Sequence, residues 1–99
     1  MSKFGELIAG KVPVLLDFYA DWNDSSTSMH PVLREVAASL GDKARVVKID
    51  IDKNQELADA LRVKGSPTLM IYKNGEMVWR QTGEQDAETL IGLLQEYLK

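Results

Sequence analysis

Apolar positions along the chain follow helical spacing in some segments and extended spacing in others. Four segments repeat apolar residues every three or four positions, which predicts amphipathic helices. They cover residues 4–8, about 23–40, 54–61 and 87–98. Asn23, Asp24 and Ser25 are all favourable N-caps for the second helix, and Gly41 fits its end. Pro31 predicts a kink within that helix, because the apolar periodicity continues past it.

Four other segments have the composition of strands, with many β-branched and aromatic residues. They cover residues 12–19, 45–51, 68–72 and 76–82. The first is a nearly continuous apolar run, which is typical of a strand buried on both faces. Asn74 and Gly75 predict a two-residue hairpin turn between the last two strands. Gly83 predicts a bulge or a close backbone approach.

The order of these elements predicts an α/β fold. A helix precedes the first strand, single helices separate the first three strands, and a hairpin and a closing helix follow. This order predicts a mixed central sheet of about four strands with helices on both faces. Because the chain has 99 residues and no repeat or linker, we expect one domain over residues 1–99.

Composition narrows the range of partners. The net charge is −3 at pH 7 and no basic stripe is present, so we expect no binding to nucleic acid or to an anionic membrane. The sequence has no apolar run long enough to cross a membrane, and its start does not resemble a secretory signal. We therefore expect a cytoplasmic protein. It would be a monomer unless an exposed edge of the sheet pairs with a second copy.

Several short motifs occur in a characteristic order. Asp-Phe-Tyr-Ala-Asp-Trp at residues 17–22 precedes the helix that contains Pro31, and Gly-Ser-Pro-Thr at 65–68 and Lys-Asn-Gly-Glu at 73–76 follow. In this order and spacing, nearly the whole chain resembles the thioredoxin family, in which Asp-Phe-Trp-Ala-x-Trp leads into Cys-Gly-Pro-Cys. The resemblance implies a thioredoxin fold whose first edge strand is missing.

The reactive residues of that family are absent. The resemblance places Asn23 and Ser26 at the positions of the two cysteines, and the chain contains no cysteine. In the family, the first thiolate attacks a substrate disulfide and the second thiol resolves the mixed disulfide. An asparagine amide is not a nucleophile here, and a serine hydroxyl cannot form a stable disulfide. We therefore expect thiol–disulfide exchange to be abolished, and we expect no cofactor.

Two further residues match the catalytic surroundings in the family. Asp17 corresponds to a buried carboxylate that helps to deprotonate the resolving thiol, and Lys48 corresponds to the lysine near it. Burying a carboxyl group costs several kcal/mol unless it is paired or protonated. A simpler interpretation is that Asp17 forms a hydrogen bond near the end of its strand.

The resemblance also implies a groove for an extended peptide. Pro67 matches the family's cis-proline, and the backbone of the residue before it, Ser66 here, pairs with substrate in the family. The residues expected to bind substrate are Trp22, Asp24, Ser25, Ser66, Pro67 and Gly83. Simpler interpretations are an ordinary turn proline at Pro67 and a partly buried packing role for Trp22.

Two other chemistries have weaker support. Ser26 and His30 lie four residues apart, so they would share one helix face as a nucleophile and its base. A serine hydrolase also needs an orienting acid and an oxyanion site, which the sequence does not indicate. Met29, His30 and Asp24 could ligate copper, but their spacing is irregular, and we expect no metal.

The sequence leaves three functional hypotheses open. The first is a variant of a protein-disulfide reductase that lost its cysteines by engineering or recent substitution. Its Cys-containing parent would be recycled by a partner similar to thioredoxin reductase. The second is a redox-inactive, chaperone-like module that binds extended peptide segments of client proteins. The third is a new enzyme that uses Ser26 and His30.

Overall fold

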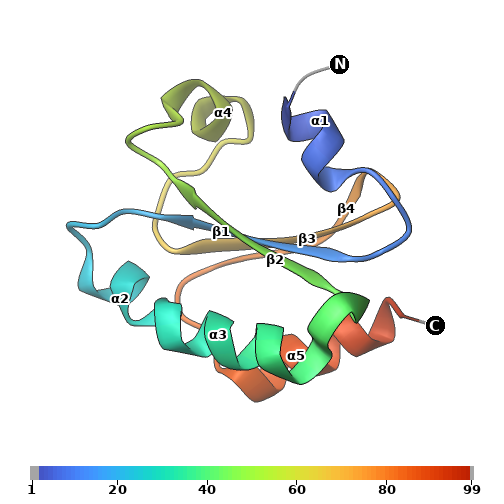
Figure 1. Ribbon diagram of the computed structural model, residues 1–99. Coiled ribbons are helices and arrows are strands. Elements are labelled where there is room, and N and C mark those ends of the chain that lie inside the picture. Colours follow the sequence, from blue (N-terminus) through green and yellow to red (C-terminus); the bar gives the residue numbers. More distant parts are fainter. Residues whose placement is uncertain (1–2, 99) are drawn as a thin grey trace.

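A mixed four-stranded sheet separates two helical layers in the computed structural model, which describes residues 3–98 (Figure 1). The strands are β1 Val14–Tyr19, β2 Arg45–Asp50, β3 Thr68–Lys73 and β4 Glu76–Thr82. Their order across the sheet is β2-β1-β3-β4. β1 is parallel to β2 and antiparallel to β3, and β3 and β4 form an antiparallel hairpin. The α/β architecture predicted from the sequence is therefore confirmed.

Helices cover both faces of this sheet. They are α1 Lys3–Ile8, α2 Asp24–Thr27, α3 Met29–Leu40, α4 Gln55–Ala60 and α5 Ala87–Glu96, with a short 3₁₀ helix η1 Gly41–Lys43. In Figure 1, α1 and α4 lie on one side of the sheet, and α3 and α5 lie on the other. No strand precedes α1 among the described residues, so β2 is an edge strand, as the sequence predicts. No helix in the described chain is long and apolar enough to span a membrane.

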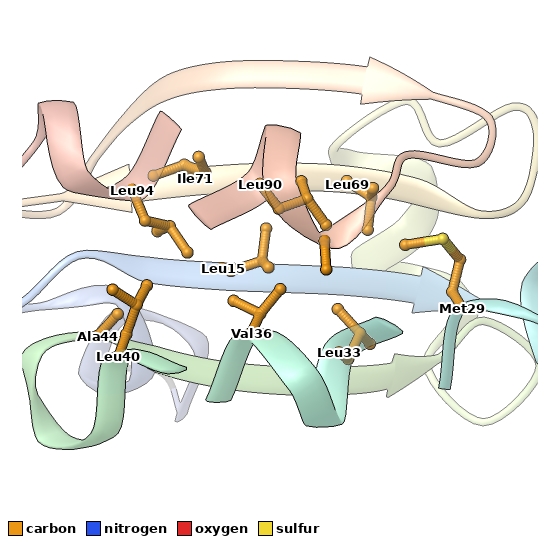
Figure 2. Close-up of a cluster of buried hydrophobic side chains, with 11 residues drawn as sticks. Leu15, Met29, Leu33, Val36, Leu40, Ala44, Leu69, Ile71, Leu90 and Leu94 are labelled. Carbon is orange, nitrogen blue, oxygen red and sulfur yellow. The ribbon is translucent and has the colours of Figure 1, made fainter. Parts of the chain in front are cut away.

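β1 lies between two hydrophobic cores. Leu15 points toward α3 and α5, where it packs in one cluster with Val36 and Leu90 (Figure 2). Leu16 and Phe18 belong to a second cluster, which includes side chains of α1 and α4. Successive strand residues point to opposite faces, so a strand covered on both sides needs apolar residues throughout. This burial explains the continuous apolar run in the sequence.

The helix predicted over residues 23–40 is interrupted between α2 and α3. Ser28 separates the two helices but keeps helical backbone angles, with φ −66° and ψ −17°. Pro31 lacks the N–H that would donate to the carbonyl of Thr27, the last residue of α2. The hydrogen-bond ladder is thus broken where the sequence predicts a kink. Gly41 ends α3 with a φ of +57°, as predicted.

Two glycine-containing turns behave differently. Asn74 and Gly75 both have positive φ, 55° and 81°, which fits the two-residue turn predicted for the β3–β4 hairpin. Gly83 has a φ of 106°, and its N–H donates to the carbonyl of Pro67 at 2.8 Å. Of the two alternatives for Gly83, the close backbone approach is therefore present. The irregularity in the sheet lies between Ile71 and Tyr72 instead.

Candidate functional site

The sheet brings three loops together at one of its ends. Phe18 near the end of β1 pairs with Thr68 at the start of β3, and Thr68 pairs with Thr82 at the end of β4. The loop after β1, the loop before β3 and the loop after β4 are therefore neighbours. These loops contain nearly all the predicted site residues. In the loop before β3, the peptide bond between Ser66 and Pro67 is cis.

Asn23 links two of these loops through its side chain. Its carbonyl oxygen accepts hydrogen bonds from the N–H groups of Ser25 at 2.8 Å and Ser26 at 3.3 Å, and so caps α2. Its Nδ2 donates to the Oγ of Ser66 at 3.2 Å and to the Ser66 carbonyl at 3.4 Å. The Asn23 amide thus satisfies helix N–H groups that would otherwise favour a thiolate, and it also occupies the acceptors of Ser66.

Ser26 joins α2 to the end of β1. Its side chain is fully buried, and its Oγ accepts a hydrogen bond from the N–H of Ala20 at 3.2 Å. Asp24, the first residue of α2, is exposed, and Ser25 is half-buried. Since an amide and a hydroxyl replace both thiols, neither candidate catalytic position has a group that can exchange electrons with a disulfide.

Asp17 is a buried acid whose carboxylate oxygens have no hydrogen-bond partner in the described chain. Burial raises the pKa of Asp17 from 3.8 to about 7, and the positive charge of Lys48 partly opposes that rise. Lys48 is the register partner of Asp17 on β2, and its side chain is exposed. The simpler interpretation of Asp17, a hydrogen bond near the strand end, is therefore wrong.

Trp22 presents its ring to solvent beside these loops. Its side chain is 73% exposed, so the packing role considered from the sequence is wrong. Its Nε1–H donates to Asp52 Oδ2 at 3.2 Å. Asp50 in turn accepts a hydrogen bond from the N–H of Asp52 at 2.9 Å, which orders the loop after β2. Trp22 is thus held at its polar edge while most of its surface remains available for contact.

The segment around Pro67 is fixed by short contacts. The carbonyl of Pro67 accepts the hydrogen bond from Gly83, and Thr68 Oγ1 donates to the carbonyl of Gly65 at 2.6 Å. Thr68 Oγ1 also lies 3.3 Å from Thr82 Oγ1. A Cβ atom on Gly65 would come within 3.1 Å of Thr82 Cγ2, so this position has little room for a side chain. The loop before β3 is therefore a rigid wall of the site.

The alternative chemistries find no support in this geometry. Ser26 and His30 lie in different helices, and no hydrogen bond joins them in the described chain. The His30 ring packs edge-on against Tyr19 with a centroid distance of 5.3 Å. Met29 is buried in the core whereas Asp24 is exposed, so the proposed copper ligands do not converge. Residues 3–98 contain no group of three or more His, Asp or Glu side chains that could hold a metal ion.

Two contacts at the site were not predicted from the sequence. Asp52 holds the indole of Trp22, and the hydroxyl of Ser28 donates to the carboxylate of Glu84 in the loop after β4. The first contact had a usable signal, because the loops that follow two adjacent parallel strands emerge at the same end of a sheet. The second depends on side-chain conformations in exposed loops, for which the sequence offers no comparable signal.

Comparisons with known proteins agree with the geometry. The thioredoxin family model matches residues 1–96. A thioredoxin-like protein from Synechocystis sp. is 40% identical over 98 residues, which are 98% of this chain and 93% of that protein. Thioredoxin from Bacillus subtilis is 41% identical over 85 residues, which are 86% of this chain and 82% of that protein. The structure of a mutant thioredoxin from Halobacterium salinarum has a TM-score of 0.89 at 36% identity, and the match covers 100% of this chain and 86% of that chain.

The fold and the site define a class: a thioredoxin-fold protein whose loop at the start of α2 contains no thiol. The family model matches nearly the whole chain, and the alignment with the Synechocystis protein covers a similar share of it. The chain belongs to the thioredoxin family.

Proposed function

We propose that this chain is a redox-inactive member of the thioredoxin family whose scaffold remains suited to protein-disulfide reduction. The observation that carries the proposal is Asp17, a fully buried carboxyl group with no hydrogen-bond partner in the described chain. A group of this kind destabilises a fold, so it needs a reason other than stability. Accepting a proton from a thiol at the position of Ser26 would be such a reason.

The proposed parent reaction needs two thiols at positions 23 and 26. A thiolate at position 23 would attack one sulfur of a substrate disulfide and release the other as a thiolate. The thiol at position 26 would lose its proton toward Asp17 and attack the mixed disulfide. The substrate would leave with two electrons and two protons, and the protein would hold a new disulfide. A partner similar to thioredoxin reductase, in the cytoplasm, would then reduce that disulfide.

The direct test is reduction of insulin disulfides by dithiothreitol, with the chain as it stands and with the Asn23→Cys/Ser26→Cys variant. We expect no acceleration by the chain and clear acceleration by the variant. A matched control is Ser25→Cys/Ser28→Cys, which has two thiols at the same spacing but displaced along the loop. Activity in the unmodified chain, or equal activity in the two dithiol variants, would contradict the proposal.

A second candidate is a peptide-binding module that needs no thiol. The observation that favours it is the exposed ring of Trp22 near the rigid loop of Ser66 and Pro67. An extended peptide could use the backbone of Ser66 and the face of the indole. Asn23 already donates to the Ser66 carbonyl at 3.4 Å, so a peptide N–H would either share this oxygen or displace a long hydrogen bond.

The two candidates are separable by experiment. If the groove binds peptides, Trp22→Ala should weaken the binding of an unfolded client such as reduced, alkylated insulin B chain. The control is Met77→Ala, which removes another exposed apolar side chain, on β4. Equal binding by the two variants would count against the peptide-binding module and would leave the first proposal intact.

A further inference from the structure

The outer edge of β2 is open to another strand. β2 pairs with β1 on one side, and no described strand lies on its other side. The N–H of Arg45 donates to the carbonyl of Pro13, and the N–H of Ile51 donates to the carbonyl of Tyr19, both at 2.9 Å. In a parallel ladder, alternate residues direct both of their backbone groups toward the neighbouring strand. Val46, Lys48 and Asp50, which alternate with the inward-directed residues, therefore direct theirs outward. The Asp50 carbonyl already accepts a hydrogen bond from Asn54 Nδ2 at 2.9 Å, which leaves Val46 and Lys48 for a further strand.

One face of this edge is a large apolar hollow. The hollow has a volume of about 740 Å³ and lies between α1, α4 and β2. Phe4 and Leu7 of α1 and Leu57 of α4 form its walls, and Ile49 of β2 contributes to its floor. Lys3, Lys48 and Asp50 also line this hollow, so its charged lining has one positive charge in excess. Lys48 lies between the two hollows and lines both of them. Side chains on this face of an added strand would find an apolar environment.

The opposite face of the same edge carries a smaller, basic hollow. It has a volume of about 180 Å³ beside α3. Its lining consists of three apolar residues and three nitrogen-bearing residues: Leu33, Ala37, Val46, His30, Arg34 and Lys48. Arg34 and Lys48 are basic side chains, and no carboxylate lines the hollow. Acidic side chains would be attracted to this face.

Side chains of a strand alternate between the two faces of a sheet. A strand that pairs with β2 would therefore direct one set of side chains into the apolar hollow and the other set into the basic one. We propose that the β2 edge is a docking site for an extended peptide in which apolar residues alternate with Asp or Glu. Backbone hydrogen bonds to Val46 and Lys48 would hold the peptide, and the two hollows would select its side chains.

Charge favours such a peptide over a second copy of this chain. Antiparallel pairing of β2 with β2 of another copy would bring a second Lys48 to the face that already contains Arg34 and Lys48. Like charges at adjacent positions of a sheet are destabilising. This edge contains Lys48 but neither Asn23, Trp22 nor the loop before β3, and it needs no thiol chemistry, so this inference does not rest on the proposed function.

The first test is a titration of the ¹⁵N-labelled chain with a synthetic peptide in which Val and Glu alternate over about ten residues, the upper end of common strand lengths. We expect amide signals of Val46, Lys48 and Ile49 to shift, while the indole signal of Trp22 stays in place. A peptide with Lys in place of Glu should bind at least about tenfold more weakly. Movement of the Trp22 indole instead, or no shift at millimolar peptide, would overturn the proposal.

The backbone is tested with N-methylated peptides. In a paired strand, alternate N–H groups point toward the neighbouring strand and the others point away. One peptide is methylated at its Val amides and a second at its Glu amides. We expect one of the two to lose binding and the other to bind as the unmethylated peptide does. Equal effects of the two modifications would show that the peptide does not pair as a strand.

The basic face is tested by charge reversal. Arg34→Glu should weaken binding of the Val/Glu peptide about tenfold and strengthen binding of the Val/Lys peptide. Lys11→Glu makes the same charge change at an exposed position that lines neither hollow, and should leave both affinities within about twofold. Circular dichroism would confirm that both variants fold. Equal effects of the two substitutions on binding would contradict the proposed occupant. A dimer detected by sedimentation that does not bind the peptide would contradict it as well.

Discussion

The loop at the start of α2 and the adjoining strand β1 differ in how well their polar groups are satisfied. The side chain of Asn23 takes part in four hydrogen bonds, and the buried hydroxyl of Ser26 accepts one. The carboxylate of Asp17 on β1 has no partner in the described chain. The hydrogen bonds of Asn23 and Ser26 are thus enough to explain why these residues stand in the loop. The stability of the fold does not explain Asp17, because a buried carboxylate without a partner is unfavourable. The polar side chains of Asn23 and Ser26 thus have partners, whereas the buried acid on β1 has none in the described chain.

Asp17→Asn should produce the largest change in stability. The folded pKa of about 7 lies above the unfolded value near 3.8, so ionised Asp17 destabilises the fold progressively as the pH rises through this window. Asn resembles the protonated acid in shape but does not ionise. At about pH 8 the free energy of unfolding should therefore increase by roughly 2–4 kcal/mol, measured by urea denaturation.

The same comparison at lower pH separates charge from packing. Near pH 4 the native carboxyl group is protonated, so the gain from Asp17→Asn should shrink to well under about 1 kcal/mol. Asp42→Asn, at an exposed position, should stay within about 0.5 kcal/mol of the parent at both pH values. A gain from Asp17→Asn that does not depend on pH would show that buried charge is not its cause.

Ser26→Ala tests whether the loop is as well satisfied as its hydrogen bonds indicate. The substitution removes the acceptor of the Ala20 N–H in a buried region. An unpaired buried donor costs about 1–3 kcal/mol, which should appear as a lower free energy of unfolding. Ser39→Ala, on the exposed face of α3, is the matched control and should be neutral or slightly stabilising. Equal effects would mean that the Ser26 hydroxyl does not hold the loop.

Substitutions at Asn23 should change the free energy of unfolding less, and they separate its helix cap from its hydrogen bonds to Ser66. Asn23→Ala removes both the helix cap and the hydrogen bonds to Ser66, and should cost about 1 kcal/mol. Asn23→Asp keeps an oxygen for the cap but cannot donate to Ser66 when ionised. The Asp variant should therefore be more stable than the Ala variant in urea denaturation, and its Ser66 amide signal should still shift. If the two variants are equally destabilised, the link to Ser66 dominates over the cap.

Much of the fold could be predicted because the preferences of neighbouring residues agree with the place of each segment in the fold. β1 combines a long apolar run with burial on both faces, and the Asn74-Gly75 turn adopts the positive φ values that its residues favour. Pro31 predicts a kink within one helix, and the structure has an interruption there between α2 and α3, where the N–H of Pro31 is missing from the hydrogen-bond ladder. Patterns of this kind depend on neighbouring residues along the chain, so one sequence is enough to predict them.

The candidate site was harder to predict, because its contacts join residues far apart in the sequence. Asn23 was expected to be an N-cap, but its bonds to Ser66 depend on how two loops meet. The indole N–H of Trp22 finds its acceptor, Asp52, in the loop after β2. Asp17 is unpaired because no donor within residues 3–98 forms a hydrogen bond with its carboxylate. Residue types alone do not determine any of these three outcomes.

The role of Asp17 is tested most directly in the restored dithiol protein. The insulin-reduction rate of Asn23→Cys/Ser26→Cys is compared with that of the same variant carrying Asp17→Asn, near neutral pH. If Asp17 is retained to accept a proton from the thiol at position 26, the added substitution should lower the rate at least about tenfold while raising stability. Equal rates in the two proteins would contradict this role, because the buried carboxyl group would then serve neither the fold nor the chemistry.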